Sequence, residues 1–334
     1  MNAAERLKLK PVPMPEQDPA ERVHNVQEVP LGFTSEMAAE EAERCLHCPD
    51  QPCVKGCPVG VQIPDFITAI QKGNFAGGIG IIKQTNLLPA VCGRVCPQES
   101  QCQKACTVGK AHHDVSQAVQ IGQLERFLAD WERKNHAQLI PQIPPPTGKR
   151  VAVIGSGPAG LTLAGDLIKL GHAVTVFEAL HKPGGVLGYG IPEFRLPKEI
   201  VYTEVSYLSQ LGVDFHYNTV IGKSLSLDEI RRDYDAIFIG SGAGLPNFLG
   251  IPGENLLGVY SANEYLTRAN LMHAYDENSN TPILRRDTVV VLGGGNVAMD
   301  SARTALRLGA HKVSILYRRS EEEMPARKEE YHHA

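Results

Sequence analysis

The pattern of apolar residues between positions 151 and 178 predicts a strand, a helix and a second strand. Four consecutive apolar residues at 151–154 are typical of a short buried strand. From position 161 to 170 the apolar residues follow helical spacing, and Gly171 ends the predicted helix. A second apolar run at 174–177 predicts the next strand. This order indicates a βαβ unit.

The same pattern returns at 289–317. An apolar run, a glycine turn, a helical pattern and a second apolar run follow one another there. The interval from Gly293 to Gly309 equals that from Gly155 to Gly171. The sequence therefore predicts two related βαβ units on one chain, which is a more specific signal than one unit alone.

Other apolar patterns predict further helices and strands. Helical spacing marks 64–75, 115–134 and 198–211, and short apolar runs mark strands at 213–217 and 236–239. Another helix is predicted before the first cysteine. Its acidic residues are interpreted as a solvated face: they are Glu36, Glu40, Glu41 and Glu43.

Proline and glycine divide the chain. The stretch 139–149 is too rich in proline for helix or sheet and is a predicted linker. Glycine and proline are also too frequent at 183–198 for a regular element. We expect an α/β protein with an α-helical domain in front. The predicted domains are a helical domain at 1–140, a Rossmann-like domain at 141–280 and the start of another at 281–334.

Charge and length exclude several classes of protein. The chain has 334 residues and a formal net charge of -4. No basic block is present, so neither nucleic acid nor an anionic membrane is an expected partner. The polar, proline-containing segment 1–26 does not resemble a signal peptide, and no apolar run has the length of a membrane span. We therefore expect a soluble, cytoplasmic protein, in whose reducing compartment cysteines are more often ligands than disulfides.

All eight cysteines lie between positions 45 and 106, in two groups of four. The first group reads C-x2-C-x4-C-x3-C and is followed by Pro58, and the second reads C-x3-C-x5-C-x3-C. Four closely spaced thiols followed by proline are typical of iron–sulfur ligands. Zinc sites usually contain paired C-x2-C knuckles, and only Cys45 and Cys48 have that spacing. Two iron–sulfur clusters are the first interpretation, and a zinc site is the alternative.

Three glycines follow the first strand at the G-x-G-x-x-G spacing of dinucleotide-binding turns. Gly155 permits the bend, Gly157 admits a pyrophosphate, and Gly160 lets helix and strand pack closely. The pyrophosphate would meet the N–H groups at the positive end of the helix. Glu178 ends the second strand, where an acid can bind a ribose hydroxyl. The alternative is an ordinary βαβ turn. The candidate residues of this first site are Gly155, Gly157, Pro158, Ala159, Gly160 and Glu178.

The second turn has Gly293, Gly295 and Ala298 at the corresponding positions. No acid ends its second strand; instead, Arg318 and Arg319 follow. Arginine can bind a phosphate on the ribose carbon where an acid would bind a free hydroxyl. The first site therefore suits FAD and the second suits NADPH, with a solvated arginine pair as the alternative. The candidate residues of the second site are Gly293, Gly295, Asn296, Val297, Ala298, Arg318 and Arg319.

Two glycine-rich stretches follow strands of the first unit, at 183–198 and 240–254. Either stretch can bring its backbone close to a cofactor or can serve as a structural loop. Their candidate cofactor-binding residues are Gly185, Leu187, Arg195 and Gly242.

Together these motifs resemble the small, pyridine-nucleotide-oxidising subunit of bacterial NADPH-dependent glutamate synthase. The resemblance runs from about residue 25 and rests on the cysteine groups and on the sequences AVCGRVCPQE, VIGSGPAGL and PGGVLGYGIPEFRLPK. It rests also on LGGGNVAMDSARTALRLGA followed by YRRSEEEMPAR. The large subunit of NADH-dependent ferredoxin:NADP oxidoreductase and the N-terminal half of dihydropyrimidine dehydrogenase are similar over the same span.

The resemblance implies how the cysteines divide between two 4Fe-4S clusters. One cluster would take Cys45, Cys48, Cys53 and Cys106. The other would take Cys57, Cys96 and Cys102, with Glu125 as a fourth, non-cysteine ligand. Cys92 would then be spare.

The resemblance also implies an electron relay. NADPH would reduce FAD, and the clusters would pass electrons to a large subunit, which in glutamate synthase forms glutamate from glutamine and 2-oxoglutarate. No side chain is expected to act as a catalytic acid or base, because the cofactors carry the chemistry. Members of the family continue beyond the position of Ala334, so we expect a partial chain. The alternatives are a subunit of a bifurcating NADH-dependent ferredoxin:NADP oxidoreductase or another dehydrogenase, and a non-enzymatic, zinc-stabilised scaffold.

Overall fold

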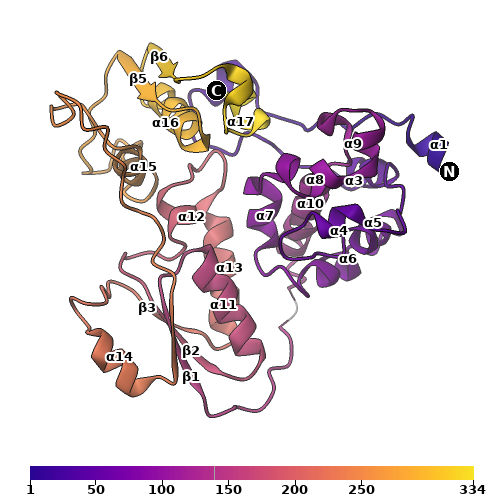
Figure 1. Cartoon of the computed structure of the whole chain (residues 1–334), viewed down its shortest axis with the longest axis horizontal. Helices are drawn as coiled ribbons and strands as arrows, with labels where there is room; N and C mark the ends of the chain where they lie inside the picture. Colours follow the sequence, from indigo (N-terminus) through magenta and orange to yellow (C-terminus); the bar gives the residue numbers. More distant parts are fainter. Residues whose placement is uncertain (139) are drawn as a thin grey trace. The chain divides into compact units, whose positions relative to one another are not determined.

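The chain forms two compact units in the computed structural model, which describes residues 1–138 and 140–334 (Figure 1). The helical unit comprises Met1–Gln17 and Val29–Ile140, and the α/β unit comprises Asp18–Glu28 and Pro141–Ala334. The predicted linker begins at Leu139, which lies outside the described residues. Its described part, 140–149, contains neither helix nor strand.

The helical unit is built around its longest helix, α10 (Ile121–Lys134), against which α3, α6 and α7 pack. The contact with α7 is tight, because a Cβ atom on Gly93 would lie 2.6 Å from the backbone nitrogen of Arg126. The other elements of the unit are α1 (Ala3–Arg6), α3 (Ser35–Ala42), α4 (Pro52–Lys55), α5 (Ile63–Gln71), α6 (Phe75–Ile82), α7 (Pro89–Val95), η1 (Gln98–Ser100), α8 (Cys102–Ala105), α9 (Thr107–Ala111) and η2 (Val115–Gln117).

Two predicted helices of this unit have different bounds in the structure. The helix predicted at 64–75 ends at Gln71, and α6 begins after Asn74, whose side chain accepts a hydrogen bond from the N–H of Gly77 at 3.0 Å. The helix predicted at 115–134 begins only at Ile121, because 115–117 is a 3-10 turn. Side-chain capping, which the apolar spacing does not reveal, fixes the start of α6.

The acidic face predicted for α3 is solvated only in part. Glu36 and Glu40 are exposed, but Glu41 is fully buried, so the interpretation was wrong for Glu41. Its carboxylate lies 2.5 Å from Nη1 of Arg44, which is 1% exposed, and it accepts hydrogen bonds from the N–H groups of Val12 and Gln120. Arg44 also donates to the carbonyl groups of Leu9, Gln117 and Ala118. This buried pair ties the N-terminal segment and α3 to the segment that joins η2 to α10.

We expect Glu41→Ala to destabilise the helical unit by about 3–5 kcal/mol, because it leaves the Arg44 guanidinium buried without its counter-charge. Urea denaturation followed by circular dichroism measures the change. Glu40→Ala, on the exposed side of the same helix, is the matched control and should change stability by less than about 0.5 kcal/mol. Equal effects of the two substitutions would contradict the role assigned to the buried pair.

The α/β unit contains two parallel sheets. Strands β3 (Asp214–His216), β2 (Ala173–Phe177), β1 (Arg150–Ile154) and β4 (Ala236–Ile239) form one sheet in that order, and β5 (Thr288–Leu292) and β6 (Lys312–Leu316) form the other. Its helical elements are α2 (Pro19–Arg22), α11 (Pro158–Lys169), α12 (Val186–Tyr189), α13 (Lys198–Gln210), α14 (Leu227–Asp233), α15 (Ala262–Asn270), α16 (Asn296–Arg307), η3 (Glu321–Glu323) and α17 (Lys328–His333). Strand–helix–strand order therefore occurs twice, as the repeat predicts.

Strand β1 is apolar on both faces because it lies inside its sheet. Ala152 belongs to a buried cluster with Phe177 and with Ile230 of α14, whereas Val153 lies against the start of α11. A central parallel strand that helices cover on both sides has a continuous run of apolar residues. Gly155 follows the carboxyl end of β1, and in open α/β folds ligands bind at the carboxyl ends of the strands.

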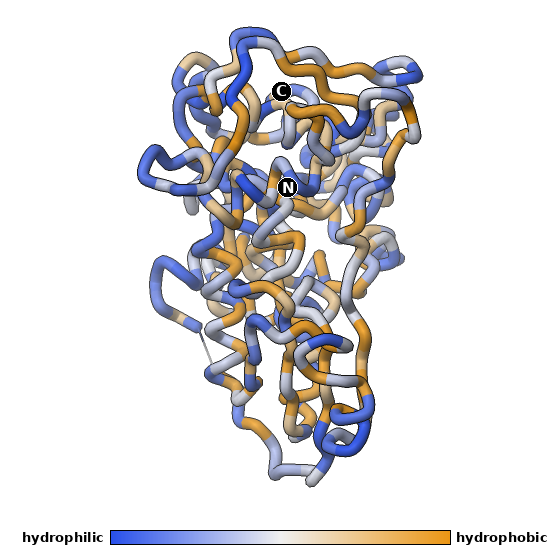
Figure 2. Tube along the Cα trace, turned by 90° about the vertical axis from the view of Figure 1, so that its left-hand side faces the viewer, coloured by the Kyte–Doolittle hydropathy of each residue, from blue (hydrophilic) through white to orange (hydrophobic). Residues whose placement is uncertain are grey.

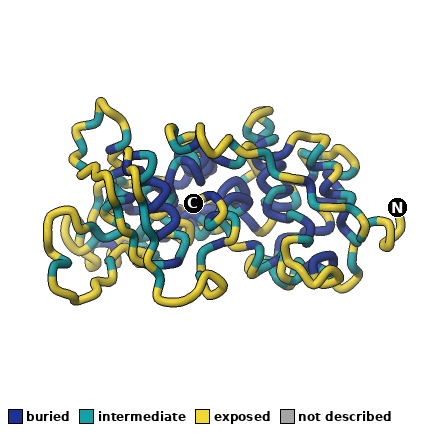
Figure 3. The backbone as a smooth tube through the Cα atoms, turned by 90° about the horizontal axis from the view of Figure 1, so that it is seen from above, coloured by how far each residue is buried: buried dark blue, intermediate teal, exposed yellow. Residues whose placement is uncertain are grey.

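Hydrophobic stretches alternate with hydrophilic segments along the whole trace, and buried residues concentrate in helices and central strands (Figures 2 and 3). The second sheet differs, because Val290, Leu292 and Leu316 are more than half exposed. The stretch 183–198 was predicted to lack regular structure, but it contains one helical turn, α12. No helix in the described part of the chain has the length and apolarity needed to span a bilayer.

Candidate functional site

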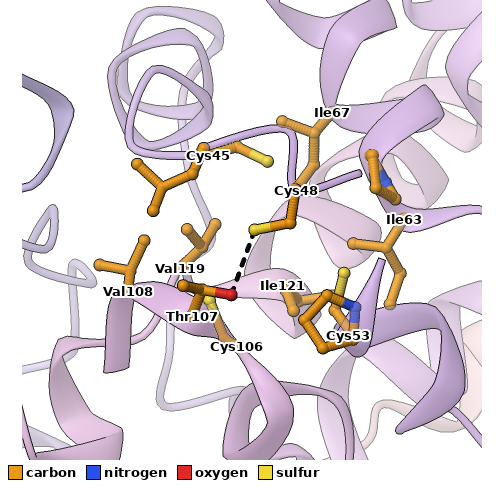
Figure 4. A pocket seen from close by; sticks show the side chains of 13 residues that line it. Cys45, Cys48, Cys53, Ile63, Ile67, Cys106, Thr107, Val108, Val119 and Ile121 are labelled. Atoms are coloured by element: carbon orange, nitrogen blue, oxygen red, sulfur yellow. Dashed lines mark hydrogen bonds between the residues drawn. The ribbon is translucent and has the colours of Figure 1, made fainter. Parts of the chain in front are cut away.

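Four of the predicted metal-binding cysteines line one pocket of the helical unit (Figure 4). Cys45 and Cys48 follow α3, Cys53 lies in α4, and Cys106 precedes α9. The thiol of Cys48 donates a hydrogen bond to the hydroxyl of Thr107 at 3.1 Å. Apolar side chains supply much of the remaining wall, among them Ile63, Ile67, Val108, Val119 and Ile121. These four cysteines are the set that the resemblance implies for one cluster.

The other predicted ligands gather around Glu125 of α10. Cys102 is within electrostatic reach of Glu125, Cys57 and Cys96, and the Glu125 carboxyl interacts in turn with Cys96. Glu125 is 8% exposed, and its Oε1 accepts a hydrogen bond from the side-chain amide of Asn86 at 2.6 Å. Cys92 lies beside the same group, within reach of Cys96 and Glu125.

Two short helices explain why the two cysteine sets are interleaved along the sequence. Cys53 and Cys57 are four residues apart on and just after α4, and Cys102 and Cys106 have the same spacing on and just after α8. One helical turn separates such residues by about 6 Å along the axis. The helices pack closely, since a Cβ on Gly56 would lie 2.8 Å from the Cβ of Ala105. Each helix therefore supplies one thiol to each set.

Burial keeps several of these groups protonated when no cation is near. It raises the pKa of the Cys45 thiol to about 11, and burial together with neighbouring thiols raises the pKa of Cys53 to about 12. Burial also raises the pKa of the Glu125 carboxyl to about 8, although the Asn86 hydrogen bond opposes the shift. Bound metal would supply the positive charge that these donors need in order to ionise together.

The chemistry of the donors fits iron–sulfur clusters. Four thiols in one apolar pocket match the usual ligand set, and the second set combines three thiols with one carboxylate. In the described part of the chain, no three His, Cys, Asp or Glu side chains are gathered closely enough to hold a single metal ion. The role of each residue as a ligand stays a prediction.

The first glycine turn has close contacts at two of its three glycines. At Gly155, where φ is +100°, a Cβ would lie 2.4 Å from the carbonyl oxygen of Gly240. At Gly160 a Cβ would lie 2.0 Å from the carbonyl oxygen of Gly155. Gly157 differs, because a Cβ there would meet nothing within 4 Å. Gly157 is also the N-cap of α11 and provides no side-chain cap, so the turn offers open space beside free N–H groups.

Glu178 lies beside this turn and is 6% exposed. Its Oε2 accepts hydrogen bonds from the N–H of Ser156, at 3.0 Å, and from the Ser156 hydroxyl, while Oε1 accepts one from the N–H of Leu180 at 2.8 Å. Glu178 therefore stabilises the glycine turn through its hydrogen bonds with Ser156. Its predicted contact with a ribose hydroxyl stays a prediction. Ser156, which is fully buried, was not singled out from the sequence although it stands between the two glycines.

The stretch 183–198 packs against the same turn. The N–H of Gly184 donates to the Ser156 hydroxyl at 3.0 Å, and a Cβ on Gly185 would lie 2.8 Å from the Cα of Gly157. Lys198 holds the stretch together, because its buried ammonium donates to the carbonyl groups of Leu187, Ile191 and Leu196. Burial lowers the pKa of Lys198 to about 8. No pattern in the sequence indicates this role of Lys198.

Arg195 joins the stretch 183–198 to helices α16 and α17. Its guanidinium lies 2.6 Å from Oδ2 of Asp300 and 2.8 Å from Oε1 of Glu330. Next to it, the ring of Phe194 lies under the guanidinium groups of Arg303 and Arg307, at 4.5 and 4.0 Å from its centroid. Arg195 is thus part of a buried ion-pair network, and its predicted contact with a cofactor stays a prediction.

The second glycine turn repeats the first in outline. Gly293 has φ +134°, and Gly295 is the N-cap of α16 without a side-chain cap. The segment after β6 folds back on the turn, with the N–H of Arg327 donating to Oδ1 of Asn296 at 2.8 Å. Arg318 and Arg319 follow β6 and are exposed.

The predicted nucleotide-site residues differ in exposure. Pro158, Ala159, Gly242, Val297, Arg318 and Arg319 are exposed. Those of intermediate exposure are Gly155, Gly157, Gly185, Gly293, Gly295 and Asn296. Buried residues are Gly160, Glu178, Leu187, Arg195 and Ala298.

Two family models match the chain. Residues 22–137 match the model described as dihydropyrimidine dehydrogenase domain II, 4Fe-4S cluster. Residues 149–332, more than half of the chain, match the model of the pyridine nucleotide-disulphide oxidoreductases. The first match favours iron–sulfur ligands over the zinc alternative for the cysteines.

Known relatives cover nearly all of this chain. A putative oxidoreductase of Escherichia coli is 38% identical over 318 residues, which are 92% of this chain and 47% of the relative. The small chain of NADPH-type glutamate synthase from Azospirillum brasilense is 37% identical over 331 residues, which are 96% of this chain and 67% of the relative. The PreT subunit of NAD-dependent dihydropyrimidine dehydrogenase from Salmonella typhimurium is 36% identical over 310 residues, which are 92% of this chain and 71% of the relative. The chain thus spans from about half to about seven tenths of these relatives.

Proposed function

Because the chain belongs to the pyridine nucleotide-disulphide oxidoreductase family and carries a 4Fe-4S domain in front of that module, we propose that it is the electron-input part of an NADPH-oxidising flavoprotein subunit. Residues 1–140 would hold two 4Fe-4S clusters, 141–280 would bind FAD, and 281–334 would begin the NADPH-binding domain. When bound, these groups supply the exchange between a two-electron donor and one-electron carriers.

The observation that carries the proposal is the presence, on one chain, of two helices headed by uncapped glycines and a pocket lined by four cysteines. A helix that begins at a glycine exposes its first N–H groups to an anion. Two such helices suit two dinucleotides, and clustered thiols suit one-electron carriers. Neither feature alone would distinguish an electron-transfer protein from other nucleotide-binding proteins.

The chain's own residues would bind and orient these groups. The open side of Gly157 and the N–H groups at the start of α11 would hold the FAD pyrophosphate, and the turn at Gly295 would hold that of NADPH. Glu178 would brace the first turn through Ser156 and bind the ribose of FAD. Cys45, Cys48, Cys53 and Cys106 would ligate one cluster, and Cys57, Cys96, Cys102 and Glu125 the other.

For the partner, we propose the large subunit of a glutamate synthase, which would make glutamate from glutamine and 2-oxoglutarate. The relatives named as glutamate synthase small chains support this choice. A relative at similar identity is named as a dihydropyrimidine dehydrogenase subunit. The second candidate is therefore the same module passing electrons to another dehydrogenase.

The test uses the full-length protein, purified without oxygen and mixed with each candidate partner. NADPH oxidation should bleach the flavin absorbance and, with the large subunit present, should depend on both glutamine and 2-oxoglutarate. Flavin bleaching without that dependence would favour the second candidate. A preparation with neither flavin nor iron would overturn the proposal.

We expect the double substitution Arg318→Ala and Arg319→Ala to raise the KM for NADPH by about tenfold or more and to change that for NADH little. A charge-assisted hydrogen bond to a phosphate contributes about 1.5–3 kcal/mol, and NADH lacks the 2′-phosphate. Steady-state kinetics with both nucleotides measures the ratio. Arg232→Ala, at an exposed position of α14, is the control. Equal changes for the two nucleotides would mean that the arginine pair is simply solvated.

A further inference from the structure

Lys198 has a buried ammonium group whose donors are all used within one stretch of the chain. Its side chain is 5% exposed. Nζ donates to the carbonyl oxygens of Leu187, at 3.1 Å, of Leu196, at 2.8 Å, and of Ile191. An ammonium group has three N–H donors and no acceptor. Lys198 therefore closes the stretch 183–198 on itself by joining three of its carbonyl groups.

The sequence of the stretch explains why a side chain supplies these donors. Pro183, Pro192 and Pro197 have no N–H, so the stretch has fewer backbone donors than carbonyl groups. The helical turn α12 ends at Tyr189, and a helix leaves its last carbonyl groups without partners of its own. Buried carbonyl groups without donors destabilise a fold. Lys198, the first residue of α13, brings three donors to the stretch.

The closed stretch lies against the first glycine turn. A Cβ on Gly185 would lie 2.8 Å from the Cα of Gly157. The N–H of Gly184 donates to the Ser156 hydroxyl at 3.0 Å, and a Cβ on Gly184 would lie 2.7 Å from Cγ1 of Val201 on α13. Gly157 is the N-cap of α11, whose first N–H groups would hold the FAD pyrophosphate. Movement of the stretch therefore changes the space beside that turn.

We propose that Lys198 is a positioning residue for FAD, because its ammonium group holds the stretch 183–198 in the shape that admits the cofactor at Gly157. The inference rests on the proposed function, since it presupposes FAD at the first glycine turn. It goes beyond that function by making retention of the cofactor depend on a side chain outside the turn. A loose stretch would have to be ordered when FAD binds, and that ordering lowers affinity.

The charged groups around Lys198 determine the pH at which its ammonium group persists. Burial lowers the pKa of Lys198 to about 8, while the carboxylates of Glu193 and Asp300 raise it and the guanidinium of Arg195 lowers it. Below about pH 8 all three N–H donors are present, whereas a neutral amine has only two for the three carbonyl groups. FAD should therefore dissociate faster as the pH rises through about 8. Asp300 titrates at lower pH, because burial raises its pKa to about 7.

The test measures FAD binding by the full-length protein, by its Lys198→Met variant and by a control variant, Lys182→Met. Methionine fills the space of the buried side chain but has no donors. Lys182 is exposed and just precedes the stretch, so its replacement removes a positive charge without removing a donor to the three carbonyl groups. Flavin fluorescence measures the dissociation constant and the dissociation rate on both sides of pH 8. Hydrogen exchange of the apoprotein measures the protection of the amides in 183–198.

Lys198→Met should raise the dissociation constant of FAD by about tenfold or more, because the loosened stretch must be ordered on binding. The amides of 183–198 should exchange faster, while the thermal unfolding of the apoprotein changes little, since removal of a buried charge offsets the lost hydrogen bonds. The wild-type dissociation rate should increase as the pH passes about 8, and the variant should show no such increase. Lys182→Met should match the wild type in each measurement.

Unchanged FAD affinity and unchanged exchange in Lys198→Met would overturn the inference, and so would equal weakening by Lys182→Met. If Lys198→Met fails to fold, the wild-type pH profile decides, because it needs no substitution: a dissociation rate that stays constant around pH 8 would then overturn the inference. A wild-type protein that binds no FAD at any pH would instead contradict the proposed function itself.

Discussion

Replacement of Cys106 with alanine is expected to remove one of the two proposed clusters and to abolish electron transfer to the proposed partner. Cys106 is 8% exposed and lines the pocket that also contains Cys45, Cys48 and Cys53. A cluster that lacks one of its four protein ligands is held weakly and exchanges with solvent. Iron should fall from about eight to about four atoms per chain.

Iron analysis and the EPR spectrum of the anaerobically reduced protein measure this loss. The remaining signal should be that of the second cluster, which also shows that the helical unit is folded. Cys92→Ala is the matched control, because it removes a neighbouring thiol of the same unit that lies outside the pocket. If Cys106→Ala kept the iron content of the wild type, the four-cysteine pocket would not be a cluster site.

The cysteine spacings predicted the kind of site, but not its division into two. Within each group of four, the members are close in sequence, which suggests one site for each group. In the structure, Cys106 of the second group joins three members of the first. The reason lies in α4 and α8, which pack side by side and offer thiols one turn apart. That packing is tertiary, so only the resemblance to a family implied the division in advance.

More of the geometry of the nucleotide turns could be predicted from the sequence. A Cβ on Gly160 would strike the carbonyl oxygen of Gly155, a contact that follows from the local strand–turn–helix geometry. The close neighbour of Gly155 is the carbonyl oxygen of Gly240 after β4, so that contact depends on the sheet. Ser156 and Lys198 could not be found in the same way. Ser156 bonds to Glu178, which follows β2, and Lys198 donates to three carbonyl groups within the stretch 183–198. Those contacts exist only once the βαβ unit and that stretch have folded.

Helix α6 shows where apolar spacing was insufficient. Its sequence, FAGGIGII, contains three glycines, each of which disfavours a helix interior by about 1 kcal/mol relative to alanine. Gly78 nevertheless belongs there, because a Cβ would lie 2.9 Å from Cδ1 of Leu128 on α10. Close packing against α10 thus outweighs a poor local propensity, and nothing local in the sequence reveals it.

Gly157→Val is expected to weaken FAD binding strongly while leaving the fold intact. Gly157 has φ -67° and ψ 177°, which valine adopts without strain, and a Cβ there meets no protein atom within 4 Å. Stability without flavin should therefore change by less than about 0.5 kcal/mol. In the holoprotein the new methyl groups would occupy the space of the pyrophosphate. Loss of two charge-assisted hydrogen bonds, at about 1.5–3 kcal/mol each, would weaken FAD by about a hundredfold or more.

Gly160→Val separates this effect from a structural one. A Cβ on Gly160 would lie 2.0 Å from the carbonyl oxygen of Gly155 and 3.1 Å from Cγ1 of Val153, so helix α11 must move away from β1. That variant should lose both thermal stability and flavin, whereas Gly157→Val should lose flavin alone. Absorbance at the flavin band and thermal unfolding of the apoprotein measure the two quantities. Full flavin content in Gly157→Val would show that no pyrophosphate lies over this turn, and the assignment of FAD to the first site would then be wrong.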